Sequence, residues 1–255
     1  MTSATSGLRP YRRLAAFVAT LGAAVALAPA PARAVENGGT VTGVVAVADP
    51  SKRGEPPIRS SGFVRRARNA LKAPRPFDPL PQLVVVLEGG TPAPEDTEPP
   101  PQMTRYTIIG ESFDVPVLPV VAGSAVEIKN NGKGSPRLFS PDMADLVPGD
   151  PVSPKGERKT KKLTKAGTSY EIRDRESAHL TGRIAVFPHR YFARVRPDGK
   201  FEIKGVPPGS WKIRIWYADG WVEMPAESVE VVAKKEAKLK QPIALPARLT
   251  TKSSP

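Results

Sequence analysis

The sequence predicts an all-β protein made of two interlocked β-sandwiches, and three observations support this prediction. Apolar residues recur with the period of a strand at Phe113, Val115 and Val117, and again at Val126 and Ile128. A second region of such alternation follows residue 190 and contains an Asp-Gly hairpin turn signal. The 255 residues include 30 prolines, a composition that favours short strands and Pro-rich connections over helices.

The first 34 residues have the features of a secretory signal peptide. Arg9, Arg12 and Arg13 form a basic start, residues 14–27 are apolar, and Ala32-Arg33-Ala34 is a small-residue cleavage site. The apolar stretch is shorter than a membrane span, which favours cleavage over an uncleaved anchor. No Cys follows the cleavage site, so we do not expect a lipoprotein. We expect a periplasmic or extracellular bacterial protein, exported by either the general secretory or the twin-arginine route.

The chain is basic, with 38 Lys and Arg against 25 Asp and Glu. Four of the basic residues and none of the acidic ones lie in the signal segment. The remaining excess favours encounters with anionic partners, although a basic surface more commonly serves solubility alone. We expect an envelope protein or an acidic glycan as partner, and no nucleic acid. We expect no transmembrane segment in the mature chain, and the sequence leaves the oligomeric state open.

The mature chain opens with two strands that a basic insert separates. Residues 40–48 are predicted to form the first strand, and residues 83–90 a second one that is rich in β-branched residues. Within the insert at 49–82, residues 61–72 have the pattern of a short basic amphipathic helix. Such a helix can bind a membrane surface, but one this short more often packs on its own domain. Residues 91–102 form a Pro-rich loop that cannot pair in a sheet.

Residues 103–188 are predicted to form the sandwich around which the rest of the chain is organised. From Phe113 the sequence reads FDVPVLPVVAGSAVEIKNN, and Leu138-Phe139-Ser140 follows. This order resembles the cupredoxin (blue-copper) family, above all its plastocyanin-like proteins of methylamine utilisation. In that family the first strands read F-x-P-x-V-L-x-V-x-x-G-T-x-V-x-F-x-N. The resemblance implies a Greek-key β-sandwich.

The copper ligands that this resemblance implies are missing. The family carries its first ligand in H-N-V-F-S and the other three in C-x-x-H-x-x-M. Here Pro136 takes the place of the first His, and Asp174, Ser177 and Leu180 take the places of Cys, His and Met. A blue-copper site needs a thiolate, and the chain has no cysteine. We therefore expect a degenerate site without cofactor or metal.

The two histidines of the mature chain suggest little further chemistry. His179, near Asp174, Glu176 and Met143, is a weak candidate for an atypical Cu(II) or Zn site, but an exposed loop histidine is the favoured interpretation. His189 lies at the predicted joint between the sandwiches, where a structural role is expected. No serine has a histidine and a carboxylate at a meaningful spacing, so we do not expect an enzyme.

The region after residue 190 resembles a second family. Residues 191–220 read YFARVRPDGKFEIKGVPPGSWKIRIWYADG. This run is similar to carboxypeptidase regulatory-like (transthyretin-like) domains, which carry D-G-x-F-x-I-x-x-V-P-P-G-x-Y-x-L, with Trp211 here in the Tyr position. Residues 39–45 and 83–87 match the two opening strands of such domains. We therefore predict that the cupredoxin-like sandwich is inserted in, or followed by, a regulatory-like sandwich formed by residues 35–90 and 189–246, with a loose tail at 247–255.

Within the last part we expect a strand at 228–232, a basic connection at 233–240 and a final strand at 242–245. Two groups of residues are candidates for binding a partner. The segment 155–165 is either an anion-binding ribbon or, as we favour, a solvated edge strand whose lysines prevent edge pairing. Trp216 and Trp221 flank a turn and are expected to be partly exposed, as a glycan-stacking strip would be, whereas Trp211 is expected in the core. The basic candidates are Lys155, Arg158, Lys159, Lys161, Lys162 and Lys165.

These observations predict an exported, non-catalytic binding or structural protein of the cell envelope with a metal-free cupredoxin-like module. Two alternatives stay open. The first is a periplasmic copper-binding or electron-transfer-related protein that uses an atypical site at His179. The second is an accessory subunit of an envelope enzyme.

Overall fold

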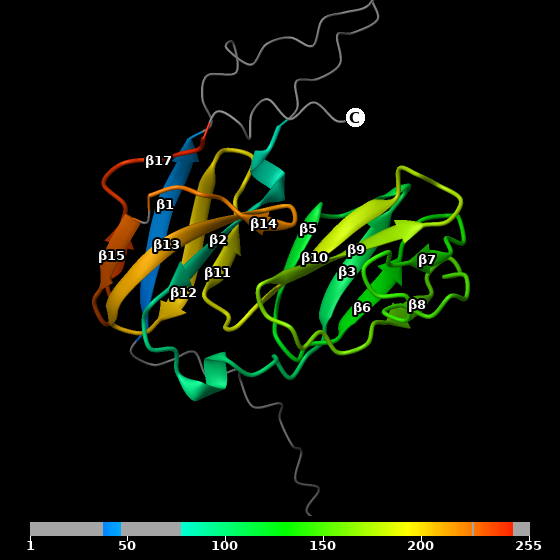
Figure 1. Ribbon diagram of the computed structural model, residues 1–255, viewed down its shortest axis with the longest axis horizontal. Coiled ribbons are helices and arrows are strands. Elements are labelled where there is room, and N and C mark those ends of the chain that lie inside the picture. Colours follow the sequence, from blue (N-terminus) through cyan, green and yellow to red (C-terminus); the bar gives the residue numbers. More distant parts are fainter. Residues whose placement is uncertain (1–37, 47–77, 226, 247–255) are drawn as a thin grey trace, which may run out of the picture. The chain divides into compact units, whose positions relative to one another are not determined.

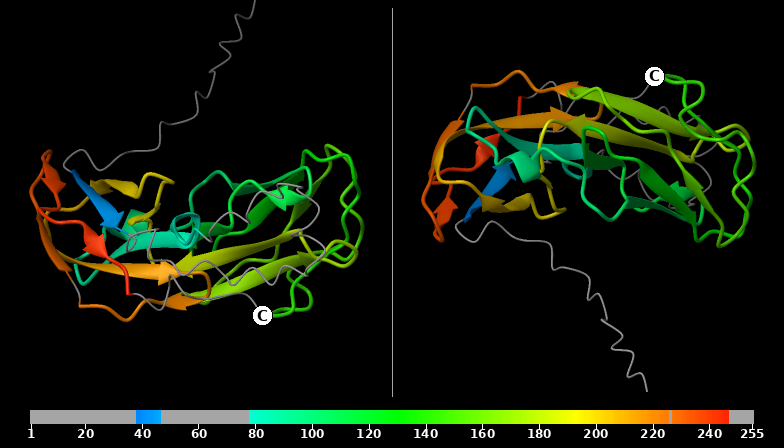
Figure 2. Two further views of the ribbon diagram at one scale, coloured as in Figure 1. Left: turned by 90° about the horizontal axis from the view of Figure 1, so that it is seen from above. Right: turned by 90° about the horizontal axis from the view of Figure 1, so that it is seen from below.

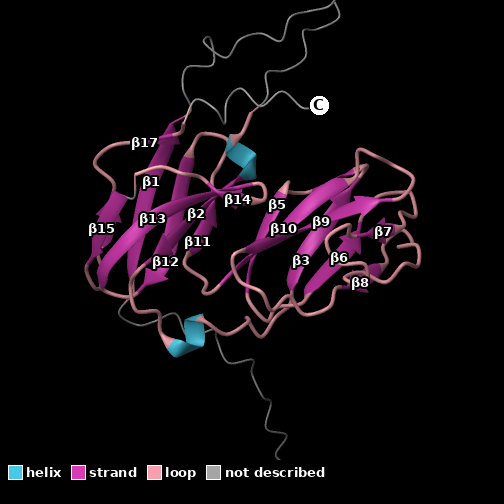
Figure 3. Ribbon diagram, viewed as in Figure 1, coloured by secondary structure: helices cyan, strands magenta, loops and turns pink. Residues whose placement is uncertain are grey.

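The computed structural model describes residues 38–46, 78–225 and 227–246, all of which belong to one compact unit that spans residues 34–255. The described residues form strands and two short 3-10 helices, Leu80–Gln82 and Pro94–Asp96 (Figure 3). The predicted all-β class is therefore confirmed. The expected signal segment, the amphipathic helix at 61–72 and the tail at 247–255 lie outside the described residues.

Strands from both ends of the described chain form the outer sandwich. Its first sheet has the order β12-β1-β16, with β17 also on β1. The strands are β1 (Gly39–Ala46), β12 (Lys200–Val206), β16 (Glu236–Lys238) and β17 (Ile243–Ala244). Its second sheet has the order β11-β2-β13-β14, with β15 also on β13. The strands are β2 (Leu83–Glu88), β11 (Phe192–Arg194), β13 (Gly209–Tyr217), β14 (Gly220–Trp221) and β15 (Glu227–Val231).

The strands between β2 and β11 form the inserted sandwich (Figures 1 and 2). One sheet has the order β4-β3-β6-β8, from β3 (Thr104–Ile109), β4 (Ser112–Phe113), β6 (Val126–Asn130) and β8 (Glu157–Lys159). The other has the order β5-β10-β9-β7, from β5 (Val117–Val121), β7 (Leu138–Phe139), β9 (Thr168–Asp174) and β10 (Thr181–Phe187).

Each sandwich has its own core, and a third apolar cluster joins them. The strand β2 reads LVVVLE, and its first five residues are buried, because both of its faces are covered. Leu83, Val85 and Leu87 face the core of the outer sandwich, whereas Val84 and Val86 belong to the joining cluster. This junction cluster also contains Val117, Ala185 and Phe187 of the inserted sandwich and Trp216 of β13. A strand that is covered on both faces has no need for polar alternation, which explains the continuous apolar run.

The structure corrects the predicted course of the strand at Phe113. Phe113 ends β4 in one sheet, whereas Val117 begins β5 in the other, so the chain changes sheets over residues 114–116. Pro116 has no N–H to donate to a ladder at this crossing. The Asp198-Gly199 turn forms with Gly199 at φ 83°, but β11 and β12 belong to different sheets, so it does not close a two-stranded hairpin within one sheet.

The segment predicted as a basic connection at 233–240 contains a strand. Residues Glu236–Lys238 form β16, which pairs in parallel with β1. The alternation of Glu236 and Lys238 with Ala237 suits a strand with one covered face, because Ala237 packs against the core. The expected strands at 228–232 and 242–245 are present as β15 and β17.

Candidate functional site

The four positions that the family resemblance assigns to copper ligands lie at or near the ends of β7 and β9. Leu138 and Asp174 are register partners in this antiparallel pair. The Asp174 carboxylate accepts two backbone hydrogen bonds, from Arg137 N–H at 2.7 Å and from Ser177 N–H at 3.1 Å. Leu180 is buried with 3% of its surface exposed. Asp174 therefore ties the loop that carries Pro136 to the loop that carries Ser177.

This arrangement leaves few side-chain atoms free to bind a metal ion. Each oxygen of Asp174 already accepts an amide hydrogen, and His179 is exposed on the loop between β9 and β10. Arg137 and Glu176 form an ion pair across the same loops at 4.0 Å, and the Arg175 guanidinium lies 5.6 Å from the centre of the Phe139 ring. Among the described residues, no group of three or more His, Cys, Asp or Glu side chains is placed to hold a metal.

The backbone bonds of Asp174 should stabilise the protein measurably. We expect Asp174→Ala to lower the free energy of unfolding by about 1.5 kcal/mol, because two backbone amides lose a charged acceptor and one of them is partly buried. The matched control is Glu176→Ala, which removes an exposed ion pair and should change stability by less than about 0.5 kcal/mol. Chemical denaturation followed by circular dichroism measures both values. Equal effects of the two substitutions would show that the Asp174 bonds contribute nothing specific.

The basic segment at 155–165 lies at the edge of a sheet, as predicted. It contains β8, the last strand in the order β4-β3-β6-β8. Two of its six cations have partners: Lys161 pairs with Asp145, and the Arg158 guanidinium donates to the Pro151 carbonyl at 2.7 Å. Within the described part of the chain, four lysines of the segment are exposed and form no ion pair: Lys155, Lys159, Lys162 and Lys165.

The expectation that Trp216 is partly exposed is wrong. Only 1% of its surface is accessible, because the inserted sandwich covers the face of β13 from which it projects. Trp221 is half buried, and the Arg214 guanidinium lies over its ring at 4.1 Å. With one ring buried and a cation over the other, the pair does not form an open strip for stacking on sugars. Trp211 lies in the core, as predicted, with 1% exposed.

A buried polar cluster lies where the chain crosses between the two sandwiches. Asp96 ends the 3-10 helix that follows β2 and is fully buried. Its carboxylate accepts a hydrogen bond from the Tyr191 hydroxyl and forms an ion pair with Arg190. The Arg190 N–H also donates to the Asp96 carbonyl at 3.0 Å. Burial raises the pKa of Tyr191, and the bond to Asp96 adds to this effect. One carboxylate therefore joins the segment that enters the inserted sandwich, which contains Asp96, to the segment that leaves it, which contains Arg190 and Tyr191.

His189 belongs to the same crossing and has the structural environment that was expected. Its Nδ1 accepts a hydrogen bond from the Tyr191 N–H at 3.3 Å, and its ring packs against the rings of Tyr191 and Trp211. Burial lowers the pKa of His189, which favours the neutral ring that this acceptor role requires.

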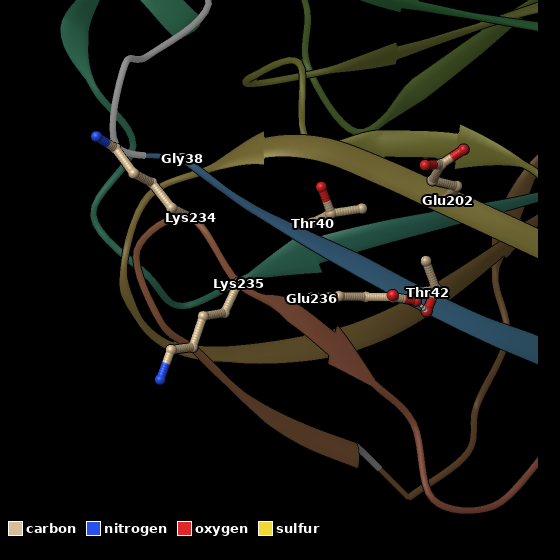
Figure 4. A pocket seen from close by; sticks show the side chains of 7 residues that line it. All are labelled: Gly38, Thr40, Thr42, Glu202, Lys234, Lys235 and Glu236. Atoms are coloured by element: carbon tan, nitrogen blue, oxygen red, sulfur yellow. Dashed lines mark hydrogen bonds between the residues drawn. The ribbon is translucent and has the colours of Figure 1, made fainter.

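Two adjoining hollows lie on the face of the β12-β1-β16 sheet that points away from the core. They have volumes of about 360 and 440 Å³ and share Thr42, Glu202 and Glu236 as lining residues. We call them together the lysine groove. Figure 4 shows Thr42 and Glu236 meeting from β1 and β16, with Glu202 on the neighbouring strand β12. The basic residues that line the groove are Arg196, Lys200, Lys234, Lys235, Lys238 and Lys240.

The acidic residues of the groove are occupied, but most of its lysines are not. The Thr42 hydroxyl donates to Glu236 at 2.6 Å, and Glu202 pairs with Lys204 at 3.3 Å and with Arg196 at 3.7 Å. In the part of the chain that the structure describes, four groove lysines form no ion pair: Lys234, Lys235, Lys238 and Lys240. These lysines lie in the segment that the sequence predicts only as a basic connection. The alternation of charged residues with Ala237 and Leu239 is the signal that predicts their shared face.

A scan against models of known protein families finds no match, and a search of curated proteins finds no similar sequence. Solved structures of two cupredoxins are similar to part of the chain. A reduced single-site mutant of amicyanin is 14% identical over 40% of this chain and 97% of its own, with a TM-score of 0.30. Amicyanin from Paracoccus versutus is 15% identical over 40% and 96%, with a TM-score of 0.30. A mutant plastocyanin of fern is 21% identical over 32% and 99%, with a TM-score of 0.27.

No helix among the described residues has the length and apolar character needed to cross a bilayer.

Proposed function

We propose that this chain is an exported, non-catalytic binding or structural protein of the cell envelope, in which the inserted sandwich resembles a cupredoxin but has no copper site. The observation that carries the proposal is the role of Asp174. This residue stands where the family resemblance places the thiolate, and both of its oxygens accept backbone amides. Hydrogen bonds that join two loops support a structural role for Asp174 in place of a redox role.

The neighbouring positions support the same function. Leu180, in the place of the axial thioether, is buried and apolar, and Pro136 offers no ligand atom in the place of the first imidazole. The signal features of the first 34 residues support export, and the basic composition supports an anionic partner at the envelope.

Metal titration tests this proposal directly. Cu(II), Cu(I) and Zn(II) are titrated by calorimetry into the purified chain and into the His179→Ala variant. We expect no stoichiometric uptake, and the same heats for both proteins. One-to-one uptake that His179→Ala abolishes would overturn the proposal and favour the alternative of an atypical copper site.

A further inference from the structure

We propose that the lysine groove binds a linear acidic polysaccharide, with its carboxylates on the lysines and its hydroxyls on the threonines and glutamates. This inference rests on the proposed binding function and gives it a place and a ligand class. Four groove lysines form no ion pair among the described residues, and unlike the equally basic edge at β8 they line hollows in which hydroxyl and carboxylate groups lie beside them.

The mixture of groups in the groove selects among anionic ligands. Thr40, Thr42, Glu202 and Glu236 line it together with the lysines. The hydroxyl and carboxylate oxygens keep lone pairs beyond the contacts that they already make, and these can accept hydrogen bonds from the hydroxyl groups of a ligand, which a DNA backbone does not offer. A ligand that carries both negative charges and hydroxyl donors satisfies both kinds of lining residue, and acidic sugars have this chemistry.

Other polyanions fit the groove less well. Single-stranded nucleic acid binds on exposed aromatic rings, and the one aromatic residue of the lining, Phe201, is 2% exposed. Insertion into a bilayer needs exposed apolar side chains. The large exposed apolar residues of the described part are Met103, Ile109 and Val232, and none of them lines the groove.

The strand geometry favours an extended ligand over a compact one. Within β16 the exposed Glu236 and Lys238 alternate with the half-buried Ala237, and the exposed Lys240 follows just beyond the strand. Glu236 and Lys238 are the register partners of Thr40 and Thr42, so these groups follow one another along the direction of β1. Lys234 and Lys235 extend from the turn before β16 at the far end of the groove (Figure 4).

The test measures binding of fluorescein-labelled alginate, a polymer of uronic acids, to the full chain by fluorescence anisotropy. We expect Lys238→Gln/Lys240→Gln to weaken binding roughly fivefold, which corresponds to about 1 kcal/mol for two exposed charge contacts. The matched control is Lys155→Gln/Lys159→Gln, which removes the same charge from the edge at β8 and should change affinity less than about twofold. Circular dichroism verifies that both variants fold.

Each other outcome has a defined meaning. An equal or larger loss in the control variant would place binding on the β8 edge and overturn the inference, but it would leave the proposed function standing. Absence of alginate binding, or tighter binding of phosphatidylglycerol vesicles or single-stranded DNA, would overturn the ligand class. Metal uptake at His179 would overturn the proposed function, but it would not affect the conclusion that the lysine groove binds alginate.

Discussion

Replacing Trp216 by alanine is expected to lower the free energy of unfolding by about 4 kcal/mol, the usual cost of removing a fully buried tryptophan from a core. The ring is 1% exposed and packs edge to face on Phe187, with 5.6 Å between the ring centres. Its Nε1–H also donates to the Ala218 carbonyl at 3.0 Å. The substitution therefore opens a cavity in the junction cluster, where strands of both sandwiches meet.

Chemical denaturation followed by far-ultraviolet circular dichroism measures this loss. The comparison is Trp221→Ala, which removes a half-buried ring from the edge of the same cluster, with its contacts to Arg214 and Trp216, and should cost about 2 kcal/mol. Because the junction cluster joins the two cores, we expect the unmodified chain to unfold in a single transition. Two separate transitions, with Trp216→Ala affecting only one of them, would contradict the structural role of this cluster.

Replacing Asp96 by alanine is expected to lower the free energy of unfolding by about 3 kcal/mol, the second-largest effect that we predict. Asp96 is fully buried, and its removal leaves the buried Tyr191 hydroxyl without its acceptor and Arg190 without its ion pair. The Arg190 side chain is 40% exposed, so water compensates part of its loss. The Tyr191 hydroxyl has no such compensation and contributes much of the cost.

A double-mutant cycle separates these contributions. Tyr191→Phe alone should cost about 1 kcal/mol, because it removes the hydroxyl but leaves Asp96 with its arginine. The double variant Asp96→Ala/Tyr191→Phe should be less destabilised than the sum of the single variants, since no hydroxyl is then left unpaired. Strict additivity, measured by urea denaturation, would show that the Tyr191–Asp96 bond contributes nothing to stability.

The fold class and the core of the outer sandwich are visible in the sequence because they follow from local alternation. Phe201 and Ile203 alternate with charged residues, and both are buried as this pattern predicts. Local reasoning fails for Trp216. Its position beside a turn is the reason to expect partial exposure, and it projects from the face of β13 opposite to Trp211, Ile213 and Ile215. A second set of strands covers that face, and the local pattern carries no information about such a cover.

The candidate site was harder to predict for a related reason. The lysine groove depends on the parallel pairing of β16 with β1, in which Thr40 is the register partner of Glu236. These residues are nearly 200 positions apart in the chain, and short segments at that distance give no pairing signal. The position of Asp174 was predictable from the family resemblance. Its role was not, because the groups that it binds are backbone amides, which every residue except proline carries.

The pairing of β2 with β11 brings the two ends of the inserted sandwich together. Val86 and Phe192 are register partners, and the Leu87 N–H donates to the Tyr191 carbonyl at 3.0 Å. A short hairpin loop could therefore join β2 to β11 in a shortened chain that lacks the residues between them. Such a chain would keep the connectivity of the outer sandwich but would expose Val84, Val86 and Trp216 to water. The outer sandwich alone would then carry an apolar patch of the kind that promotes association between molecules.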